Sequence, residues 1–378
     1  MSTHVFDLVV VGSGGGVDET DLSAYLLKPS GASWDAGIIA LEAGSGKGAL
    51  KQILFQNPDL FNTDSSSPLI SADQIYNLVQ CFLVTHSHLD HVACLAIMAG
   101  SLSGTRKRVY ALMDVLEDLQ EHIFNDRLWP KLGSFDDRPG EDYKYLYTAL
   151  DPQMYHKLES FPNVSVKVAL LNHGHAAESG RQYHSSAFFI QDNTSGKEFL
   201  FFGDVQPDSL SSTPLTIDVW RDAAPKIPDI LNVIFIECSW PSSREDSSLY
   251  GHLKPEHLRD EIISLATQVY LSRNPTIATA NGSTAAGTSH SGTRSPRRKK
   301  RKVDPPAPVP APPVLEPGSL HGILKGLRVY VMHCKDQLNG QPGSTMKDLI
   351  VSQVQTLVEA ENLGVEIFSV DQGTHIRI

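Results

Sequence analysis

This chain of 378 residues lacks several features, and each absence excludes a class of protein. No window approaches about 18 uninterrupted apolar residues, so we expect no membrane-spanning helix and no membrane partner. The first residues lack the basic and apolar regions of a signal peptide. Cysteines are few, and Cys81, Cys94, Cys238 and Cys334 lie far apart without forming a CxxC pair. They predict buried free thiols in a reducing compartment, and therefore a cytoplasmic protein.

Basic residues are also scarce outside one short segment. The net charge is −11, from 32 basic and 43 acidic residues. The segment from Arg294 to Lys302 holds seven basic residues and no acidic one, so the remainder has 25 basic against 43 acidic residues, a balance of −18. A body this acidic repels long polyanions, so DNA or RNA is not expected as the substrate.

The segment from Thr85 to His91 is the richest in metal-ligand residue types. It directly follows a short apolar run, residues 79–84, whose β-branched and aromatic side chains predict a buried strand. The ligand-type residues are therefore expected in the loop at the C-terminal end of that strand. They are His86, His88, Asp90 and His91.

These four residues form the pattern HxHxDH. Histidines at positions i and i+2 of a loop can face one metal ion, while the aspartate and the last histidine face a second ion about 3.5–4 Å away. Imidazole and carboxylate are ligands that zinc prefers. One histidine is commonly explained by hydrogen bonds within a structural loop, but this combination favours a two-metal hydrolase.

Other apolar runs also end at a histidine, an aspartate or a glutamate. They are residues 164–171 before His173 and His175, residues 199–202 before Asp204, residues 231–236 before Glu237, and residues 327–332 before His333. These runs predict strands whose C-terminal ends gather polar side chains. Apolar stripes at helical spacing predict helices over residues 92–99, 109–124, 258–269 and 346–363.

A glycine-rich turn follows the first predicted strand, residues 6–11. The dinucleotide-binding fingerprint GxGxxG would need glycine at position 17, where Val17 stands. No amphipathic helix follows, because residues 23–27 read as another strand. The turn therefore joins two strands, and a nucleotide cofactor is disfavoured.

Residues 276–318 cannot build a core. They are rich in Ala, Gly, Ser and Thr, then basic, then rich in proline, which predicts a disordered insertion. The part that follows is too short to fold alone, so we expect one domain over residues 1–378. The basic run from Arg297 to Lys302 is typical of a signal for a nuclear import receptor, so the nucleus is a second expected location; a solvated charged linker is the alternative.

HxHxDH is the signature of the metallo-β-lactamase superfamily, and this chain resembles that superfamily in the order of its later motifs. The resemblance implies a mixed α/β fold, a four-layer αββα sandwich with two metal ions at its strand ends. It also implies that His173 completes the first metal site, Asp204 bridges both sites, and His333 completes the second. His175 competes with His173; His173 is preferred because it directly follows the predicted strand and precedes a glycine.

The chain further resembles, from residue 5 onward apart from the insertion, the class II cyclic nucleotide phosphodiesterases of fungi and some bacteria. The motifs are HSHLDH from His86, FNDRLWP from Phe124, GDV from Gly203, ECS from Glu237 and YGHL from Tyr250. The resemblance implies hydrolysis of cAMP, with cGMP as a second substrate, to the 5′-nucleotide. A hydroxide bridging two zinc ions would attack phosphorus, and Mn²⁺ or Fe²⁺ are alternative ions.

The same resemblance implies roles for individual residues. His252 corresponds to the general acid and Glu237 to its orienting partner, while Asp90 counts as catalytic as well as a ligand. From spacing alone, His252 fits a surface loop equally well. Asn125 and Trp129 are candidates for the substrate pocket, and capping and packing of a helix end is an equal alternative.

Two residues depart from the family pattern. Glu42 stands where the superfamily usually has aspartate, and Cys94 where family members tend to have glycine or serine. Neither is expected to touch a ligand residue. Endonuclease activity on tRNA 3′ ends and thioester hydrolysis, found elsewhere in the superfamily, remain alternative functions. The sequence leaves a homodimer open.

Overall fold

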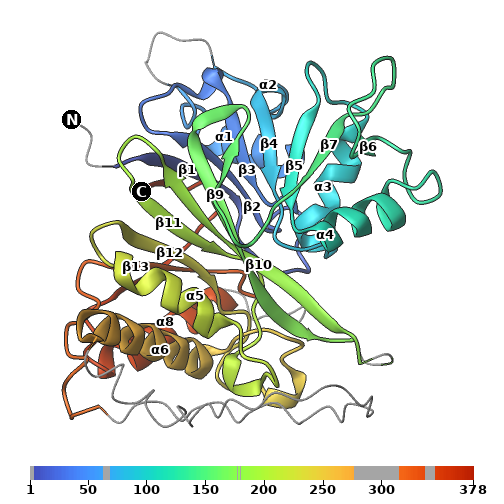
Figure 1. Ribbon diagram of the computed structural model, residues 1–378. Coiled ribbons are helices and arrows are strands. Elements are labelled where there is room, and N and C mark those ends of the chain that lie inside the picture. Colours follow the sequence, from blue (N-terminus) through green and yellow to red (C-terminus); the bar gives the residue numbers. More distant parts are fainter. Residues whose placement is uncertain (1–3, 63–68, 177, 179, 276–314, 337–344) are drawn as a thin grey trace, which may run out of the picture.

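Helices cover both outer faces of two stacked β-sheets in the computed structural model (Figure 1). The structure describes residues 4–62, 69–176, 178, 180–275, 315–336 and 345–378. This order of layers, helix, sheet, sheet, helix, agrees with the αββα sandwich expected from the sequence.

The first sheet contains eight strands among the described residues. In spatial order they are β15 (His375–Arg377), β1 (Phe6–Gly12), β2 (Ala24–Pro29), β3 (Ile38–Leu41), β4 (Val79–Leu83), β5 (Lys107–Ala111), β7 (Tyr145–Ala149) and β6 (Gly133–Ser134). Strands β3, β4, β5 and β7 run parallel, so their carboxyl ends meet at one edge. The helices on this side are α1 (Lys47–Gln56), α2 (Ala72–Leu78), α3 (Leu89–Ala99) and α4 (Met113–Asp118), continued by a π-helix (Leu119–Ile123).

The second sheet contains seven strands within the described ranges. In order they are β14 (Glu366–Ser369), β13 (Arg328–Met332), β12 (Leu231–Glu237), β11 (Glu198–Phe202), β10 (Gln182–Asp192), β9 (Phe161–His175) and β8 (His156–Leu158). Strands β11 to β14 run parallel. Helices α5 (Thr216–Ala223), α6 (Pro255–Arg273) and α8 (Met346–Ala360) lie on the outer face. Short 3₁₀ segments are Trp34–Ala36, Asp208–Leu210, Ala224–Lys226 and Asp246–Ser248.

Aromatic side chains from the two sheets pack against one another in the core. The Phe6 and Phe199 rings lie edge to face with centroids 5.4 Å apart, and Tyr25 meets Phe201 at 5.2 Å. All four are fully buried. Burying such a side chain stabilises the fold by about 1.5–3 kcal/mol. This packing fixes the two sheets relative to each other, so the strand ends of both sheets face one site.

The segment after the insertion adds strands to both sheets. Strand β13 pairs with β12, with Val331 opposite Ile236, and β15 pairs with β1, with Ile376 opposite Leu8. The tail therefore completes both sheets, as its short length led us to expect. Residues 276–314, which include the basic run from Arg297 to Lys302, lie outside the described residues.

Three expectations about local structure are wrong. Residues 109–124 do not form one helix, because Val109 and Tyr110 are buried in β5 between β4 and β7. Asp90 and His91 belong to the first turn of α3 rather than to the loop after β4. Strand β9 continues through Asn172 to His175, so His173 lies within the strand rather than after it. The cysteines follow the expectation: all four are free and buried.

Glu261 on α6 holds the segment that follows β11. Its carboxylate accepts hydrogen bonds from the Asp208 backbone N–H (3.0 Å) and the Trp220 indole N–H (2.8 Å). Burial raises the pKa of Glu261 from 4.5 to about 7. The stability that this group contributes is therefore complete below about pH 4.5 and is lost as the pH rises through about 7.

Glu261→Gln cannot ionise at this position. Between pH 5 and pH 8 we therefore expect the free energy of unfolding of the wild type to fall by up to roughly 3 kcal/mol more than that of the variant. The amide leaves one N–H donor without an acceptor, which lowers the stability of the variant at pH 5, so the informative quantity is the change in stability between the two pH values. Denaturant unfolding at both pH values measures it. Equal losses in the two proteins would contradict the buried, protonated state.

Candidate metal centre

The structure brings the seven ligand-type residues together where the strand ends of the two sheets lie close to each other. His86 and His88 follow β4, Asp90 and His91 begin α3, His173 lies in β9, Asp204 follows β11 and His333 follows β13. They form two groups, within each of which the ligand atoms lie within 4.8 Å of one another. One group is His86, His88, His173 and Asp204; the other is Asp90, His91, Asp204 and His333. His175, the alternative to His173, is exposed.

Asp204 is shared by both groups, and each carboxylate oxygen faces one of them. Its Oδ2 lies 3.5 Å from His86 Nε2 and 3.4 Å from His173 Nε2. Its Oδ1 lies 3.3 Å from the Nε2 atoms of both His91 and His333. The aspartate therefore lies between the two groups, with one oxygen toward each.

Several donor atoms of the two groups face one another or lack a hydrogen-bond partner. The ring nitrogens of His173 (Nε2) and His88 (Nδ1) face each other at 3.2 Å. Both Asp204 oxygens and His86 Nε2 are buried without a hydrogen-bond partner. Such atoms are costly to leave unpaired, at about 1–3 kcal/mol each. Cation binding removes this cost, so the residues fit a metal centre.

The protonation states of His86, His173 and Asp204 suit metal ligands. Burial lowers the pKa of His173 to about 3 and that of His86 well below its usual value, so both imidazoles are neutral. Burial would raise the pKa of Asp204, but the surrounding histidines, His333 first among them, hold it well below its usual range. His91 differs: its pKa lies well above the ordinary value, because Asp204 and Glu42 outweigh the effect of burial.

Residues around the ligands orient the imidazole rings. The Thr85 hydroxyl lies 3.1 Å from His86 Nδ1, and the carbonyl oxygen of Gly251 accepts a hydrogen bond from His173 Nδ1 at 3.0 Å. The Ser239 hydroxyl lies 3.0 Å from His333 Nδ1. Partners of this kind set the tautomer and direction of a ligand ring. Sequence reasoning assigned none of them a role.

Glu42 corrects one expectation from the sequence. Its Oε2 lies 3.6 Å from His91 Nδ1, and its carboxylate also accepts a hydrogen bond from the Thr85 backbone N–H at 3.2 Å. Glu42 is buried. The residue that departs from the superfamily pattern therefore does touch a ligand-type residue, and it sets the charge beside His91.

Gly15 packs directly against His333. A Cβ at position 15 would lie 2.6 Å from His333 Nδ1 and 2.7 Å from its carbonyl oxygen, closer than real Cβ atoms approach their neighbours. The glycine-rich turn between β1 and β2 therefore leaves room for a ligand-type residue as well as reversing the chain.

We expect Gly15→Ala to displace the His333 ring and to weaken metal binding and turnover by at least about tenfold. This is the smaller of the effects seen when a residue that orients a metal ligand is changed. Gly48→Ala is the matched control, because a Cβ there meets nothing within 4 Å. Metal content and turnover, measured on both variants, test the expectation. Wild-type values for Gly15→Ala would show that His333 tolerates the contact.

His252 and Glu237 lie beside the second group. His252 Nδ1 is 3.0 Å from Glu237 Oε1 and 3.7 Å from Asp204 Oδ2, and both residues are buried. Ser239 donates a hydrogen bond to the other Glu237 oxygen at 2.6 Å. His252 is therefore not a surface-loop histidine. Burial lowers its pKa to about 3 and raises that of Glu237.

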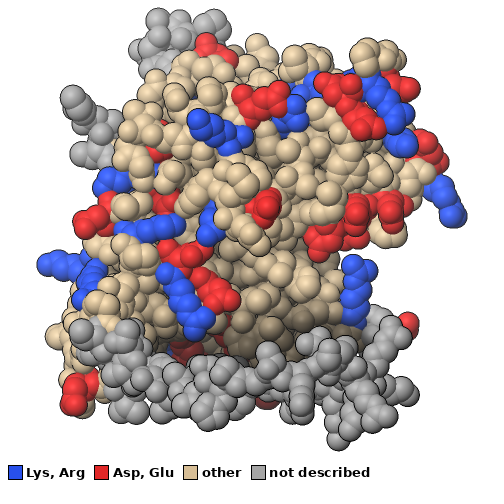
Figure 2. Space-filling model, in the orientation of Figure 1, with Lys and Arg blue, Asp and Glu red and all other residues tan. Residues whose placement is uncertain are grey.

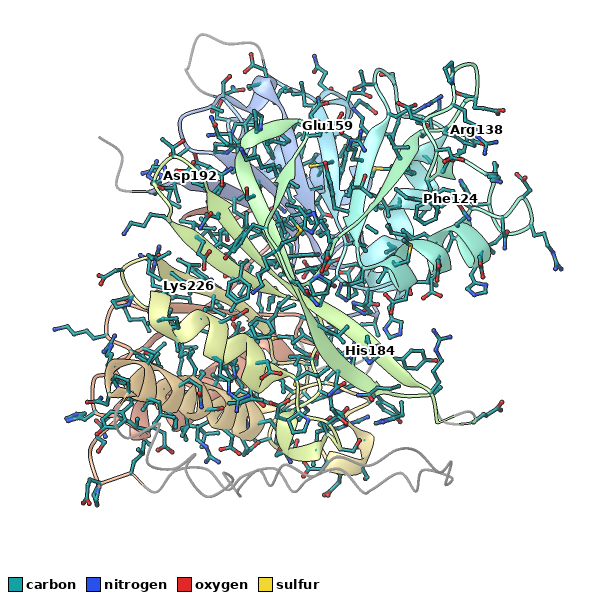
Figure 3. The ribbon with its side chains drawn as sticks, viewed as in Figure 1. Phe124, Arg138, Glu159, His184, Asp192 and Lys226 are labelled. Atoms are coloured by element: carbon teal, nitrogen blue, oxygen red, sulfur yellow. The ribbon has the colours of Figure 1, made fainter. Side chains whose placement is uncertain are left out.

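A cavity of about 520 Å³ opens over His86 and His88, between α4 and the projecting end of the β9–β10 hairpin. Figure 2 shows acidic side chains gathered over α4 beside a hollow, and Figure 3 places His184 on the projecting part of β10.

Asn125 and Trp129 do not line this cavity. The Asn125 side chain instead accepts hydrogen bonds from the backbone N–H groups of Arg127 and Leu128.

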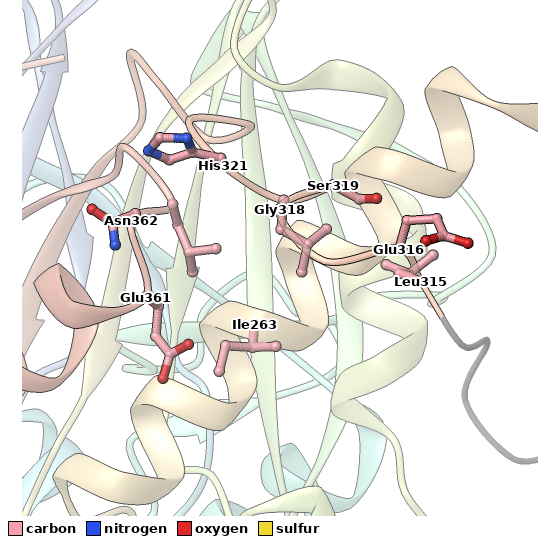
Figure 4. A pocket seen from close by; sticks show the side chains of 10 residues that line it. Ile263, Leu315, Glu316, Gly318, Ser319, His321, Glu361 and Asn362 are labelled. Carbon is pink, nitrogen blue, oxygen red and sulfur yellow. The ribbon is translucent and has the colours of Figure 1, made fainter.

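A separate cavity of about 560 Å³ lies beside α6, lined in part by Ile263, His321, Glu361 and Asn362 (Figure 4). The groups of metal-ligand type found among the described residues include none of its lining residues. The strand-end cluster therefore remains the candidate active site.

A family model for class II cAMP phosphodiesterases matches residues 49–281 of the sequence. The chain belongs to this family. A 3′,5′-cyclic-nucleotide phosphodiesterase of Schizosaccharomyces pombe is 33% identical over 280 residues, which cover 70% of this chain and 76% of that protein. The family predicted from the motifs around His86, Asp204 and Glu237 is thus confirmed.

Solved structures confirm the predicted fold. Unliganded yeast PDE1 superimposes on this class II chain with a TM-score of 0.74 at 23% identity, covering 100% of both chains. YhfI of Bacillus subtilis, a metallo-β-lactamase fold protein, gives a TM-score of 0.53 at 11% identity, covering 98% of this chain and 99% of that one. Among the described residues, none of the helices has the length and hydrophobicity of a membrane span.

Proposed function

We propose that this class II family member hydrolyses 3′,5′-cyclic nucleotides, cAMP and also cGMP, to 5′-nucleotides and thereby ends cyclic nucleotide signals. The single observation that carries the proposal is the position of Asp204 between two groups of ligand-type residues, in a chain of this family. Two adjacent sites suit phosphodiester chemistry, in which charge develops on several oxygens at once.

Two zinc ions are the proposed cofactors, with Mn²⁺ or Fe²⁺ as substitutes. The ligands would be His86, His88, Asp90, His91, His173, Asp204 and His333, the residues that meet at the strand ends. Ions held there would supply a water-derived nucleophile at neutral pH and neutralise charge on the phosphoryl oxygens. Metal analysis of the purified protein tests both the identity and the number of the ions.

His252 is proposed as the general acid that protonates the leaving 3′-oxygen. Glu237 accepts the hydrogen bond from its Nδ1 at 3.0 Å, which orients the ring and favours the imidazolium form when substrate adds negative charge. Asp90 orients the second group: its Oδ2 lies 3.3 Å from His333 Nε2 and 3.9 Å from Lys335 Nζ. These are the three proposed catalytic assignments.

An assay with cAMP, cGMP, a thioester and a tRNA precursor, each with and without chelator, tests the function. We expect chelator-sensitive hydrolysis of cAMP and no cleavage of the tRNA precursor, because the chain is acidic and Asp114 and Asp118 line the cavity over the site. Turnover of the thioester or the tRNA precursor without turnover of cAMP would establish the alternative.

Three further proposals concern the whole chain. Residues 1–378 form one catalytic domain, since β13 and β15 pair with strands from the first part of the chain. The protein is cytoplasmic and also nuclear, through a receptor that binds the run from Arg297 to Lys302; deleting that run should lower the nuclear fraction. Homodimer formation is testable by sedimentation of the purified protein.

A further inference from the structure

We propose that Tyr183 is the stacking surface for the nucleobase, so that the base and ribose lie in the cavity between β10 and α4 while the cyclic phosphate lies at the metal centre. This inference rests on the proposed function and identifies the residue that recognises the nucleoside half of its substrate.

Tyr183 stands directly beside the metal centre. Its ring lies edge to face with His88 at 5.6 Å between centroids, and it lines the same cavity as His86 and His88. The residue is 44% exposed, so a ligand in the cavity can reach it. A phosphate held at His88 would therefore place the attached ribose and base next to this ring.

The size of the cavity suits a mononucleotide. Its volume of about 520 Å³ lies within the usual range for small-molecule sites, roughly 300–1,000 Å³. One wall is the end of the β9–β10 hairpin with Arg181 and Tyr183, and the other is α4 with Asp114 and Asp118.

The carboxylates of the α4 wall decide which half of the substrate lies against that wall. The carboxylates of Asp114 and Asp118 repel phosphate but accept hydrogen bonds from a hydroxyl or an exocyclic amine. Asp118 is held by the Ser87 hydroxyl, which donates to its Oδ2 at 2.7 Å. The uncharged nucleoside therefore suits this cavity, whereas a polynucleotide would bring further phosphates against the carboxylates.

Stacking explains why an aromatic ring is useful here. Every base has a flat π-face, and stacking on an aromatic side chain is a large part of nucleotide binding in other proteins. The stacked base changes little during phosphodiester cleavage, so its contribution should appear in KM and not in kcat.

The test compares Tyr183→Ala and Tyr183→Phe on cAMP and on the 3′,5′-cyclic phosphate of methyl riboside, which has no base. We expect Tyr183→Ala to raise KM for cAMP by roughly tenfold, with kcat within about twofold of wild type, and Tyr183→Phe to stay near wild type. For the substrate without a base, both variants should match the wild type. Metal content should be unchanged in both.

Two results would overturn the inference while leaving the proposed function intact. The first is an unchanged KM for cAMP in Tyr183→Ala. The second is an equal loss on both substrates, which would mean that the ring acts only by orienting His88. Failure of the wild-type protein to hydrolyse cAMP at all would instead overturn the proposed function, and this inference with it.

Discussion

Replacing Asp204 with asparagine should abolish hydrolysis of cAMP and remove bound metal. The carboxylate faces His86 and His173 with one oxygen and His91 and His333 with the other, at 3.3–3.5 Å. An amide keeps one oxygen, loses the negative charge and directs an N–H₂ donor at one group. Changing a residue that only orients a ligand lowers metal affinity or activity by about 10–100-fold. The loss of activity in Asp204→Asn should therefore exceed a hundredfold.

Two measurements separate lost metal from lost folding. Metal content after gel filtration should fall in Asp204→Asn, and added zinc should no longer raise Tm, because an ion stabilises only the state that binds it. Asp222→Asn is the matched control: it makes the same substitution on α5, where Asp222 pairs with Lys167. Wild-type metal content and turnover in Asp204→Asn would disprove the bridging position.

The ligand-type residues could be predicted from the sequence because each one lies at or near the end of an apolar run. Parallel strands bring their carboxyl ends to one edge, so polar residues such as Asp204 and His333, placed directly after strands, meet in space. The HxHxDH pattern identified the edge on which they meet. Family motifs then added His252 and Glu237, which the structure places 3.0 Å apart.

Contacts that depend on tertiary structure could not be predicted in this way. Glu42 and Ser239 reach His91 and His333 only because strands from different parts of the chain lie side by side, and no spacing within the sequence records this. Tyr183 is exposed, and no sequence pattern distinguishes it from other tyrosines near a turn.

Secondary structure was misassigned where the apolar pattern is ambiguous. Val109 and Tyr110 are both buried although they are neighbours, because strand β5 is covered on both faces. Such a run lacks the alternation of a half-buried strand and cannot be separated from a buried helix by periodicity. The helix over residues 109–124 was predicted for this reason, and the true helix starts at Met113.

Removing the His252 imidazole should slow turnover of cAMP by about 10²–10⁴-fold while leaving metal content near wild type. The side chain is hydrogen-bonded to Glu237 and lies 3.7 Å from Asp204. It belongs to neither group that contains Asp204 but forms a third group with Glu237 and His333, so metal content is measured alongside turnover. His257→Ala is the matched control, because His257 is also a buried histidine but belongs to α6 and pairs with Asp246.

The leaving group distinguishes a proton donor from a residue that only positions its neighbours. Bis(4-nitrophenyl) phosphate releases a phenolate that needs no proton, whereas cAMP releases an alkoxide. If His252 donates the proton, His252→Ala should lose far less activity on the nitrophenyl ester than on cAMP. Glu237→Gln, which keeps an acceptor for His252 Nδ1 but loses the charge, should show the same contrast to a smaller degree. Equal losses on both substrates would assign His252 to the support of His333, whose ring stacks on it at 5.4 Å.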